Sequence, residues 1–207
     1  WARDSWMVQG SPVRFLGASY FFFKCVQIFA DAPSGKLRLC AGPTLLHLLW
    51  APTLPSGPMA RYRHFVRSAF RDSRRAAASL LARGAWRIVL GSVKCAVLAP
   101  ALLPYATDWR SFGSTAFSTI PALDLVASLV LYSLYLYWDF SGICDVAISV
   151  SALLGVRIPE NFRAPYFSRD LSAFWRRWHM TLSSLLRDYV FLPSARRAGT
   201  LLPRLMA

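Results

Sequence analysis

Apolar residues gather in five blocks along this 207-residue chain, and the lengths of the blocks predict helices. The blocks are Val13–Ala32, Leu39–Pro55, Ile88–Ala106, Pro121–Trp138 and Ile143–Val156. A helix that spans a membrane needs about 20 mostly apolar residues, with a range of about 17–25. The third and fourth blocks are long enough, and the first also qualifies if Lys24 faces protein or water. We therefore expect an all-α, polytopic integral membrane protein.

Two of these blocks are predicted to be broken or re-entrant helices. The second block contains Pro43, Pro52 and Pro55, and each proline removes a helical hydrogen bond. The last block is short for a span, and Gly142 and Gly155 lie before it and near its end. Irregular backbone is tolerated at membrane depth only where protein or a water-filled cavity covers it. The two segments together therefore indicate an internal polar cavity.

The segment "FWRRWHMTLSSLLRDYVFLP" predicts one further helix near the end of the chain. Its apolar and polar residues sort into separate stripes at about 100° per residue. Asp170 is placed to cap the start of this helix, which we expect to run to Leu192. Pro193 cannot continue a helix and is therefore expected to end it.

The stripes of that helix predict how it packs. Trp175 and Trp178 lie on the apolar stripe, which we expect to pack against protein. His179 lies at the seam between stripes, one turn from Arg176 and from Ser183. Such a position suits a ring that packs against apolar surface and reaches a polar groove, so we expect the seam to face a cavity. A structural histidine and a catalytic one fit this position about equally well.

The composition supports a membrane protein and argues against other classes. Hydrophobic residues make up 55% of the chain and the mean hydropathy is +0.36, which is too apolar for an ordinary soluble domain. The net charge of +14 comes from arginines that lie between apolar blocks without a recognition motif, so we expect no nucleic-acid partner. The four cysteines form no CxxC pair and no metal-ligand cluster is visible, so we expect core cysteines and no metal site. We expect one domain, partial in extent, over residues 1–207.

The arginines predict which side of the membrane each loop occupies. Met59–Arg87 carries eight arginines against one aspartate, which places it in the cytoplasm by the positive-inside rule. Thr107–Ile120 carries only Asp108 and Arg110 and is then expected outside. The basic region from residue 157 to 204 returns to the cytoplasmic side.

The stretch "YWDFSGICD" places Asp139 and Asp145 between two apolar blocks. A carboxylate within a membrane segment is costly and usually has a partner. Arginines that could serve as partners are Arg157, Arg163, Arg176 and Arg177. In the alternative reading, Asp139 or Ser141 caps a helix that starts near Gly142. We favour a structural role, in which the carboxylates shape the cavity, over a role in the chemistry.

A connector bounded by prolines, Arg157–Trp175, precedes His179. Its Asn161, Arg163 and Tyr166 are candidates for contact with an anionic ligand. A solvated loop at the membrane surface is the alternative interpretation.

The run from Tyr137 to Pro193 resembles the signature region of the membrane-bound O-acyltransferase family. It contains D-F-S-G-x-x-D-x-A, then P-x-N-F-x-x-P-Y, then F-W-R-R-W-H-x-x-L-S-x-x-x-R-D-Y. The resemblance is to the bacterial branch concerned with alginate O-acetylation and with D-alanyl transfer to teichoic acids. Upstream, "PTLPSGPMARYRHF" resembles the proline-glycine-proline segment of the family. The resemblance reaches most of the chain and is weak over Trp1–Leu39.

The resemblance implies an activity and a location. Members of this family transfer an acyl group from a thioester donor, acyl-CoA or an acyl carrier protein, to a hydroxyl group. In the bacterial branch the acceptor is an exported polysaccharide or polymer, so we expect acetyl transfer to such an acceptor, with periplasmic partner proteins. The expected location is the bacterial inner membrane, crossed several times, with the donor on the cytoplasmic side. The donor is a co-substrate, and no bound cofactor is expected.

The resemblance also implies roles for individual residues. His179 matches the first histidine of the family and is expected to assist at the reacting centre, since histidine supplies a base with a pKa near neutrality. The residues expected to bind substrate, with the first two steering an anionic donor, are Arg176, Arg187, Ser183 and Asn161. The residues expected to hold the cavity together are Asp139, Asp145, Trp175 and Trp178.

Two rival functions remain at this stage. The second histidine of the family, in a G-L-W-H-G-like context, is not found in these 207 residues, so we expect the chain to be a fragment. A non-enzymatic transporter or channel subunit would also use broken helices, intramembrane carboxylates and cytoplasmic arginines. An inactive membrane scaffold is the other rival.

The expected sidedness can be tested by cysteine labelling in cells. A membrane-impermeant reagent added outside should modify a cysteine introduced at Ser114 and spare one introduced at Ser73. The motivation is the arginine-rich loop around Ser73 and the arginine-poor loop around Ser114. The reverse pattern would overturn the assignment.

Overall fold

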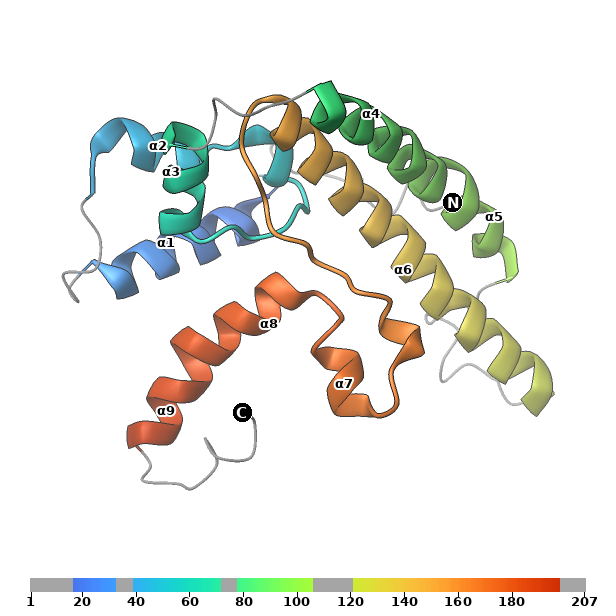
Figure 1. Ribbon diagram of the computed structural model, residues 1–207. Helices are drawn as coiled ribbons and strands as arrows, with labels where there is room; N and C mark the ends of the chain where they lie inside the picture. Colours follow the sequence, from blue (N-terminus) through green and yellow to red (C-terminus); the bar gives the residue numbers. More distant parts are fainter. Residues whose placement is uncertain (1–16, 33–38, 72–77, 106–120, 198–207) are drawn as a thin grey trace, which may run out of the picture.

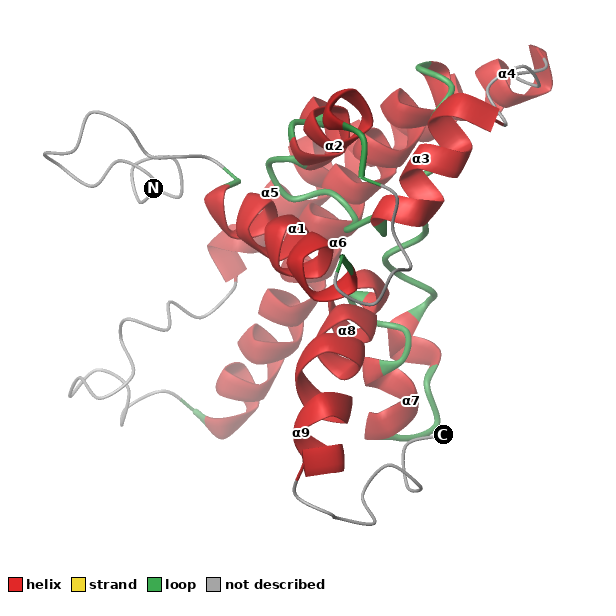
Figure 2. Cartoon of the chain, turned by 90° about the vertical axis from the view of Figure 1, so that its left-hand side faces the viewer, coloured by secondary structure: helices red, strands yellow, loops and turns green. Residues whose placement is uncertain are grey.

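The computed structural model describes four ranges of the chain: residues 17–32, 39–71, 78–105 and 121–197 (Figure 1). Every regular element in these ranges is a helix and none is a strand (Figure 2), so the all-α prediction is confirmed for them. The expected outer loop, Thr107–Ile120, and the position Ser73 lie outside the described residues. The sidedness of the chain therefore stays a prediction.

Two long apolar helices lie side by side and run in opposite directions (Figure 1). These are α4 (Ala78–Val93) and α6 (Ala122–Leu153). The chain leaves α4 through a π-helical turn, Lys94–Leu98, and continues into α5 (Ala99–Leu102) and a 3₁₀ turn, Leu103–Tyr105.

These helices carry two stretches that could cross a membrane by length and composition, Ala82–Tyr105 and Ala122–Leu153. Only 11% and 0% of their most apolar windows are buried within the protein. A core helix of a soluble domain would bury this surface, because large apolar patches rarely stay exposed to water. The exposure therefore favours contact with lipid or with further apolar protein.

The sequence prediction of two separate blocks around Gly142 is wrong, because α6 is continuous from Ala122 to Leu153. Asp139 and Ser141 lie inside this helix, so the reading in which they cap a new helix near Gly142 is also wrong. The two halves of α6 differ in environment, since all seven buried residues lie between Ser141 and Ser151. The apolar first half faces outward and the second half packs within the protein.

Gly142 has a packing role where α6 meets α4. A β-carbon added at Gly142 would lie 2.6 Å from the carbonyl oxygen of Gly91 on α4. One added at Gly91 would lie 2.8 Å from the carbonyl oxygen of Gly142. Both distances are shorter than van der Waals contact, so glycine at both positions lets the two backbones approach closely. Small residues serve the same purpose where helices pack in membranes.

The first part of the chain forms three shorter helices and confirms the predicted break in the second apolar block. The helices are α1 (Ala18–Asp31), α2 (Ala41–Leu48) and α3 (Tyr62–Arg71). After α2 the chain makes only a 3₁₀ turn, Ala51–Thr53, and then loses helical structure until Tyr62. The described part of α1 has 14 residues, so α1 is not among the candidate spans.

Lys24 of α1 does face protein, as the sequence required. Its ammonium group is buried and donates hydrogen bonds to the carbonyl oxygen of His47 at 3.0 Å and to Oγ1 of Thr53 at 3.4 Å. A cation near the last carbonyl groups of a helix is favourable, so Lys24 stabilises the C-terminal end of α2.

The main core cluster joins this region to the end of α6 and the connector and comprises Trp50, Ala60, Phe65, Ile148, Val156 and Ile158.

The connector after α6 leads to three short helices in place of the single predicted one. These are α7 (Leu171–Trp175), α8 (Met180–Leu186) and α9 (Leu192–Arg197), with a π-helical turn at Arg187–Phe191. The predicted cap is confirmed, because the side chain of Asp170 accepts a hydrogen bond from the backbone N–H of Ala173 at 2.7 Å.

The predicted course of that helix is wrong at two places. The helix breaks between Trp175 and Met180, and Pro193 lies inside α9 instead of ending the helix. The connector explains the break, because its backbone replaces helical hydrogen bonds. Arg163 N–H donates to the Arg177 carbonyl at 3.0 Å, and Met180 N–H donates to the Asn161 carbonyl at 2.9 Å.

The close approach of α4 and α6 predicts an asymmetric effect of adding one methyl group. Gly142→Ala should lower the free energy of unfolding by about 1–3 kcal/mol, because the new β-carbon meets backbone. Gly42→Ala in α2 is the matched control, since its β-carbon would meet nothing within 4 Å. Chemical unfolding of the detergent-solubilised protein measures both. A Gly142→Ala protein as stable as the control would contradict the packing role.

Candidate active site

His179 lies at the break between α7 and α8 with a left-handed backbone, φ 45° and ψ 50°. In the described residues Ala164 is the only other non-glycine residue with a positive φ. Residues other than glycine rarely adopt this backbone conformation, and backbone strain of this kind clusters at functional sites. The break is therefore the place where a candidate site is expected.

The ring of His179 is held by Asn161 from the connector. Its Nδ1 lies 2.9 Å from Oδ1 of Asn161, which is completely buried. The same oxygen accepts hydrogen bonds from the backbone N–H of Thr181 at 3.3 Å and from its hydroxyl at 2.9 Å. Nδ2 of Asn161 donates to Sγ of Cys144 on α6 at 3.3 Å. Asn161 thereby joins the connector, α6 and α8 around the histidine.

His179 is neutral at physiological pH. Burial lowers the pKa of its imidazole to about 4. The edge of the Phe140 ring packs against it, with ring centroids 4.8 Å apart and planes at 87°. No described residue forms a hydrogen bond with Nε2, so this nitrogen is open to a further partner.

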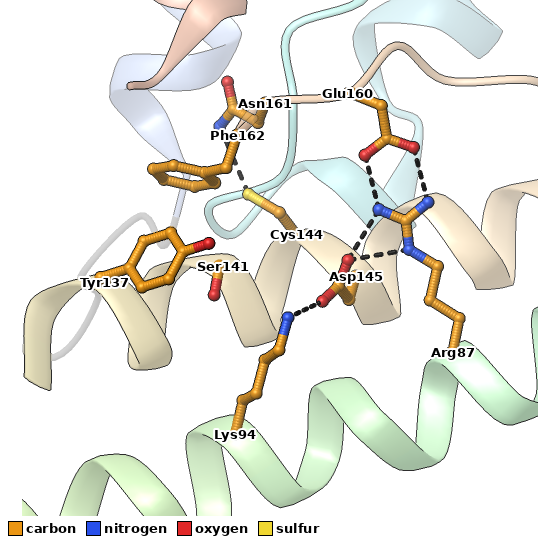
Figure 3. Close-up of a pocket in the computed structure, with 9 residues that line it drawn as sticks. All are labelled: Arg87, Lys94, Tyr137, Ser141, Cys144, Asp145, Glu160, Asn161 and Phe162. Atoms are coloured by element: carbon orange, nitrogen blue, oxygen red, sulfur yellow. Dashed lines mark hydrogen bonds and ion pairs between the residues drawn. The ribbon is translucent and has the colours of Figure 1, made fainter. Parts of the chain in front are cut away.

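Asn161 also lines a polar cavity of about 70 Å³, which lies between α4, α6 and the connector (Figure 3). It is lined by Arg87, Lys94, Tyr137, Ser141, Cys144, Asp145, Glu160, Asn161 and Phe162. The hydroxyl of Ser141 is buried there and has no hydrogen-bond partner among the described residues. The sequence predicted a polar cavity from two broken segments, whereas this cavity lies between α4, α6 and the connector, and no residue of Leu39–Pro55 lines it.

Four charged side chains along this cavity form an ion cluster of Arg87, Lys94, Asp145 and Glu160 (Figure 3). Arg87 on α4 binds both oxygens of Glu160 at 2.6 Å, and its Nε lies 2.8 Å from Oδ1 of Asp145. Lys94 Nζ lies 2.7 Å from the other oxygen of Asp145. Charge-assisted pairs of this kind are the strongest hydrogen bonds in proteins. The ion cluster therefore ties the connector and α6 to α4.

The predicted partners of the two aspartates need correction. The cations that bind Asp145 come from α4 and from the π-helical turn after it, and none of Arg157, Arg163, Arg176 and Arg177 does so. The reason is the antiparallel contact of α4 and α6, which brings Arg87 and Lys94 opposite Asp145. Asp139 is half-buried on α6 and forms no ion pair with a described residue.

A second, larger cavity of about 340 Å³ also adjoins the connector. It is lined by Met59, Arg61, His64, Pro159, Glu160, Met180, Thr181 and Ser184. Neither His179 nor Ser183 lines either cavity, so the predicted exposure of this seam to a cavity is not borne out by the two linings, although Asn161, Met180 and Thr181 beside His179 do line them. No group of three or more His, Cys, Asp or Glu side chains in the described ranges could hold a metal ion.

The remaining candidate residues, Arg176, Ser183 and Arg187, line neither cavity. Arg176 is exposed and its Nη1 donates to the Ser172 hydroxyl at 2.7 Å, while Arg187 is exposed and pairs with Asp188. The hydroxyl of Ser183 donates to the carbonyl oxygen of Trp178 at 3.4 Å. The predicted roles of these residues in substrate binding stay predictions.

The two tryptophans, predicted to lie on one apolar stripe, differ in their burial. Trp178 contacts the rings of Tyr137, Phe162, Tyr166 and Phe174, with centroids 5.1–6.4 Å apart. Trp175 is 54% exposed, so the expected burial of both tryptophans on one face is wrong for Trp175. The break after Trp175 removes the helical register that placed them together.

Sequence reasoning missed the cations of the ion cluster and the Asn161–His179 contact. Arg87 and Lys94 stand seven positions apart beside and within an apolar block. That spacing puts both on one helix face, and an apolar helix with two cations needs carboxylate partners. The sequence therefore did contain a signal for the two cations of the ion cluster. No local signal in the sequence indicates the hydrogen bond between Asn161 and His179.

Comparison with known proteins finds one family model and several relatives that match this chain. A family model described as the membrane-bound O-acyltransferase family matches residues 36–207. The chain is 36% identical over 183 residues to the teichoic acid D-alanyltransferase of Bacillus subtilis, covering 87% of this chain and 45% of that protein. It is 31% identical over 187 residues to the probable alginate O-acetylase AlgI of Azotobacter vinelandii, covering 89% and 36%.

A third relative has a different polymer in its name. The chain is 30% identical over 150 residues to the peptidoglycan O-acetyltransferase of Helicobacter pylori, covering 72% of this chain and 28% of that protein. The chain thus spans less than half the length of each of these relatives.

The contrast between the two tryptophans predicts unequal losses of stability. Trp178→Ala should lower the free energy of unfolding by about 3 kcal/mol, because four aromatic rings lose a neighbour. Trp175→Ala should cost less than about 1 kcal/mol, as expected for an exposed position. Unfolding of the two detergent-solubilised variants gives the comparison. Equal losses would show that the aromatic contacts of Trp178 do not hold the break.

Proposed function

Because this chain belongs to the membrane-bound O-acyltransferase family, we propose that the complete protein transfers an acyl group from a thioester donor to a hydroxyl group. The single observation that carries a role for this segment is the neutral His179, held at Nδ1 by buried Asn161 and open at Nε2. The donor is acyl-CoA or an acyl carrier protein, reaching the site from the cytoplasmic side. The protein crosses the bacterial inner membrane several times.

The acceptor is an exported polysaccharide or polymer, and the acyl group is acetyl in this proposal. The names of the relatives support the acceptor class, since they refer to teichoic acid, alginate and peptidoglycan. Two of these names specify acetyl transfer and one specifies D-alanyl transfer. Periplasmic proteins that handle the polymer are the expected partners.

The reaction needs a group that manages one proton. The acceptor hydroxyl attacks the thioester carbonyl carbon, so that a C–O bond forms, the C–S bond breaks and the hydroxyl proton ends on the departing thiol. A neutral imidazole is able to accept that proton or its hydrogen bond, and positioned bases contribute about 10²–10⁴-fold to rate. In this scheme His179 supports the reaction through Nε2, and a second histidine outside these 207 residues shares the work.

The other residues of the segment hold this geometry or guide the donor. The ion cluster fixes the connector that carries Asn161, because Glu160 and Asn161 are neighbours in the chain. Arg176 and Arg187 are exposed cations, which suits steering of an anionic donor toward the site.

The proposal predicts that His179→Gln in the complete protein lowers acyl transfer by about 10²–10⁴-fold while the protein stays folded. The glutamine keeps a polar side chain but cannot exchange a proton near neutral pH. Acylated polymer and the amount of protein in the membrane are measured together. Ser194→Ala, an exposed change on α9, is the control and should leave both unchanged.

The outcomes separate the acyltransferase from its rivals. Full acylation by His179→Gln would sink the role of this histidine in the reaction. Absence of acyl transfer in the unaltered complete protein would favour a transporter subunit or an inactive scaffold.

A further inference from the structure

We propose that Asn161 is a positioning residue for His179, an inference that rests on the proposed acyl transfer. Its side-chain oxygen holds the imidazole in one tautomer, with the proton on Nδ1 and the lone pair on Nε2. In this scheme Asn161 acts through the histidine and touches no substrate: its oxygen accepts from His179 and Thr181, and its nitrogen donates to Cys144. The role differs from the substrate contact that the sequence alone indicated.

The hydrogen bonds around Asn161 identify which of its atoms faces the histidine. The backbone N–H of Thr181 lies 3.3 Å from that atom, and a backbone N–H can only donate. The Thr181 hydroxyl accepts from the backbone N–H of Met59 at 3.0 Å, so its own proton is free to be donated to Asn161 at 2.9 Å. An oxygen satisfies both donors, whereas an amide nitrogen would face them with its own hydrogens.

The tautomer of His179 follows from this assignment. Oδ1 of Asn161 has no proton to give, so the hydrogen bond at 2.9 Å needs the proton on Nδ1. In a neutral imidazole the other nitrogen then carries the lone pair. Nε2 is therefore the basic nitrogen, and it is also the one without a described partner.

Besides setting which nitrogen of His179 carries the proton, Asn161 fixes the position of the ring. Its backbone carbonyl accepts from Met180 N–H at 2.9 Å, and its side chain binds Thr181, so the two residues after His179 are both tied to it. Phe140 packs against the ring with centroids 4.8 Å apart. These contacts hold the left-handed backbone of His179, which would otherwise relax.

A neutral acceptor has an electrostatic advantage over a carboxylate at this position. A carboxylate beside imidazole favours the protonated ring and raises its pKa by about 1–3 units. An amide sets the tautomer without adding that charge, so the ring keeps its lone pair near neutral pH. The ionisable groups that line the two cavities beside the pair are Tyr137, Cys144, Asp145, Glu160, Arg87, Lys94, Arg61 and His64. The cations nearest to the pair along the chain are Arg163, Arg176 and Arg177.

Two substitutions of Asn161 in the complete protein test the proposal. Asn161→Ala removes the acceptor and should lower kcat by about 10²-fold or more, with little change in KM for the donor. In the catalytic triad of a serine protease, loss of tautomer control lowers kcat by about 10⁴-fold. Asn161→Asp restores an acceptor and should regain most of kcat at high pH. The acid limb of its pH–rate profile should move upward by about 1–3 units.

A second readout does not depend on activity. Nitrogen NMR of histidine-labelled protein, with the His179 signals assigned by His179→Gln, reports which ring nitrogen carries the proton. The unaltered protein should show Nε2 unprotonated at neutral pH, and Asn161→Ala should show a mixture of both tautomers.

The outcomes either support or overturn the positioning role. An Asn161→Ala protein with unchanged kcat, or one with the same single tautomer, would overturn it. If Asn161→Ala does not accumulate in the membrane, Asn161→Asp decides, and an unshifted acid limb would overturn the role. If the unaltered protein transfers no acyl group, the proposed function fails, and the NMR comparison still decides whether Asn161 sets the tautomer.

Discussion

The hydrogen bonds that the connector gives to the segment after α7 are the constraint on which the site depends. A continuous helix from Asp170 would satisfy its own backbone groups, and local sequence favours it. The connector offers Arg163 N–H and the Asn161 carbonyl as replacements, and the helix opens there. Buried backbone groups must find partners, so the break exists only while the connector stays in place.

The connector in turn is held in place by α4 and α6. Glycine at positions 91 and 142 lets the two helix backbones approach closely, and this brings Arg87 opposite Asp145. Arg87 then reaches Glu160 in the connector, one residue before Asn161. The helix contact therefore positions the ion cluster, the ion cluster positions the connector, and the connector positions the histidine.

Local signals in the sequence were enough for some of this structure. The broken segment after α2 followed from its prolines, and the cap at Asp170 followed from the short reach of a carboxylate to N–H groups three residues on. The break at His179 was missed, because helical periodicity extends through it and only distant backbone bonds favour opening. Gly142 was misread as a helix end, since its role lies in contact with Gly91, 51 positions earlier.

The length of α6 has a consequence for where the ion cluster lies relative to the bilayer. A helix of 32 residues is about 48 Å long, whereas the hydrocarbon layer is about 30 Å thick. Tilt alone does not absorb this mismatch, because it would have to exceed the usual upper range of about 40°. The exposed apolar first half of α6 is the part suited to lipid, so the second half emerges toward the headgroups. The ion cluster then lies near the boundary of the lipid, where buried charges are less costly than at the midplane.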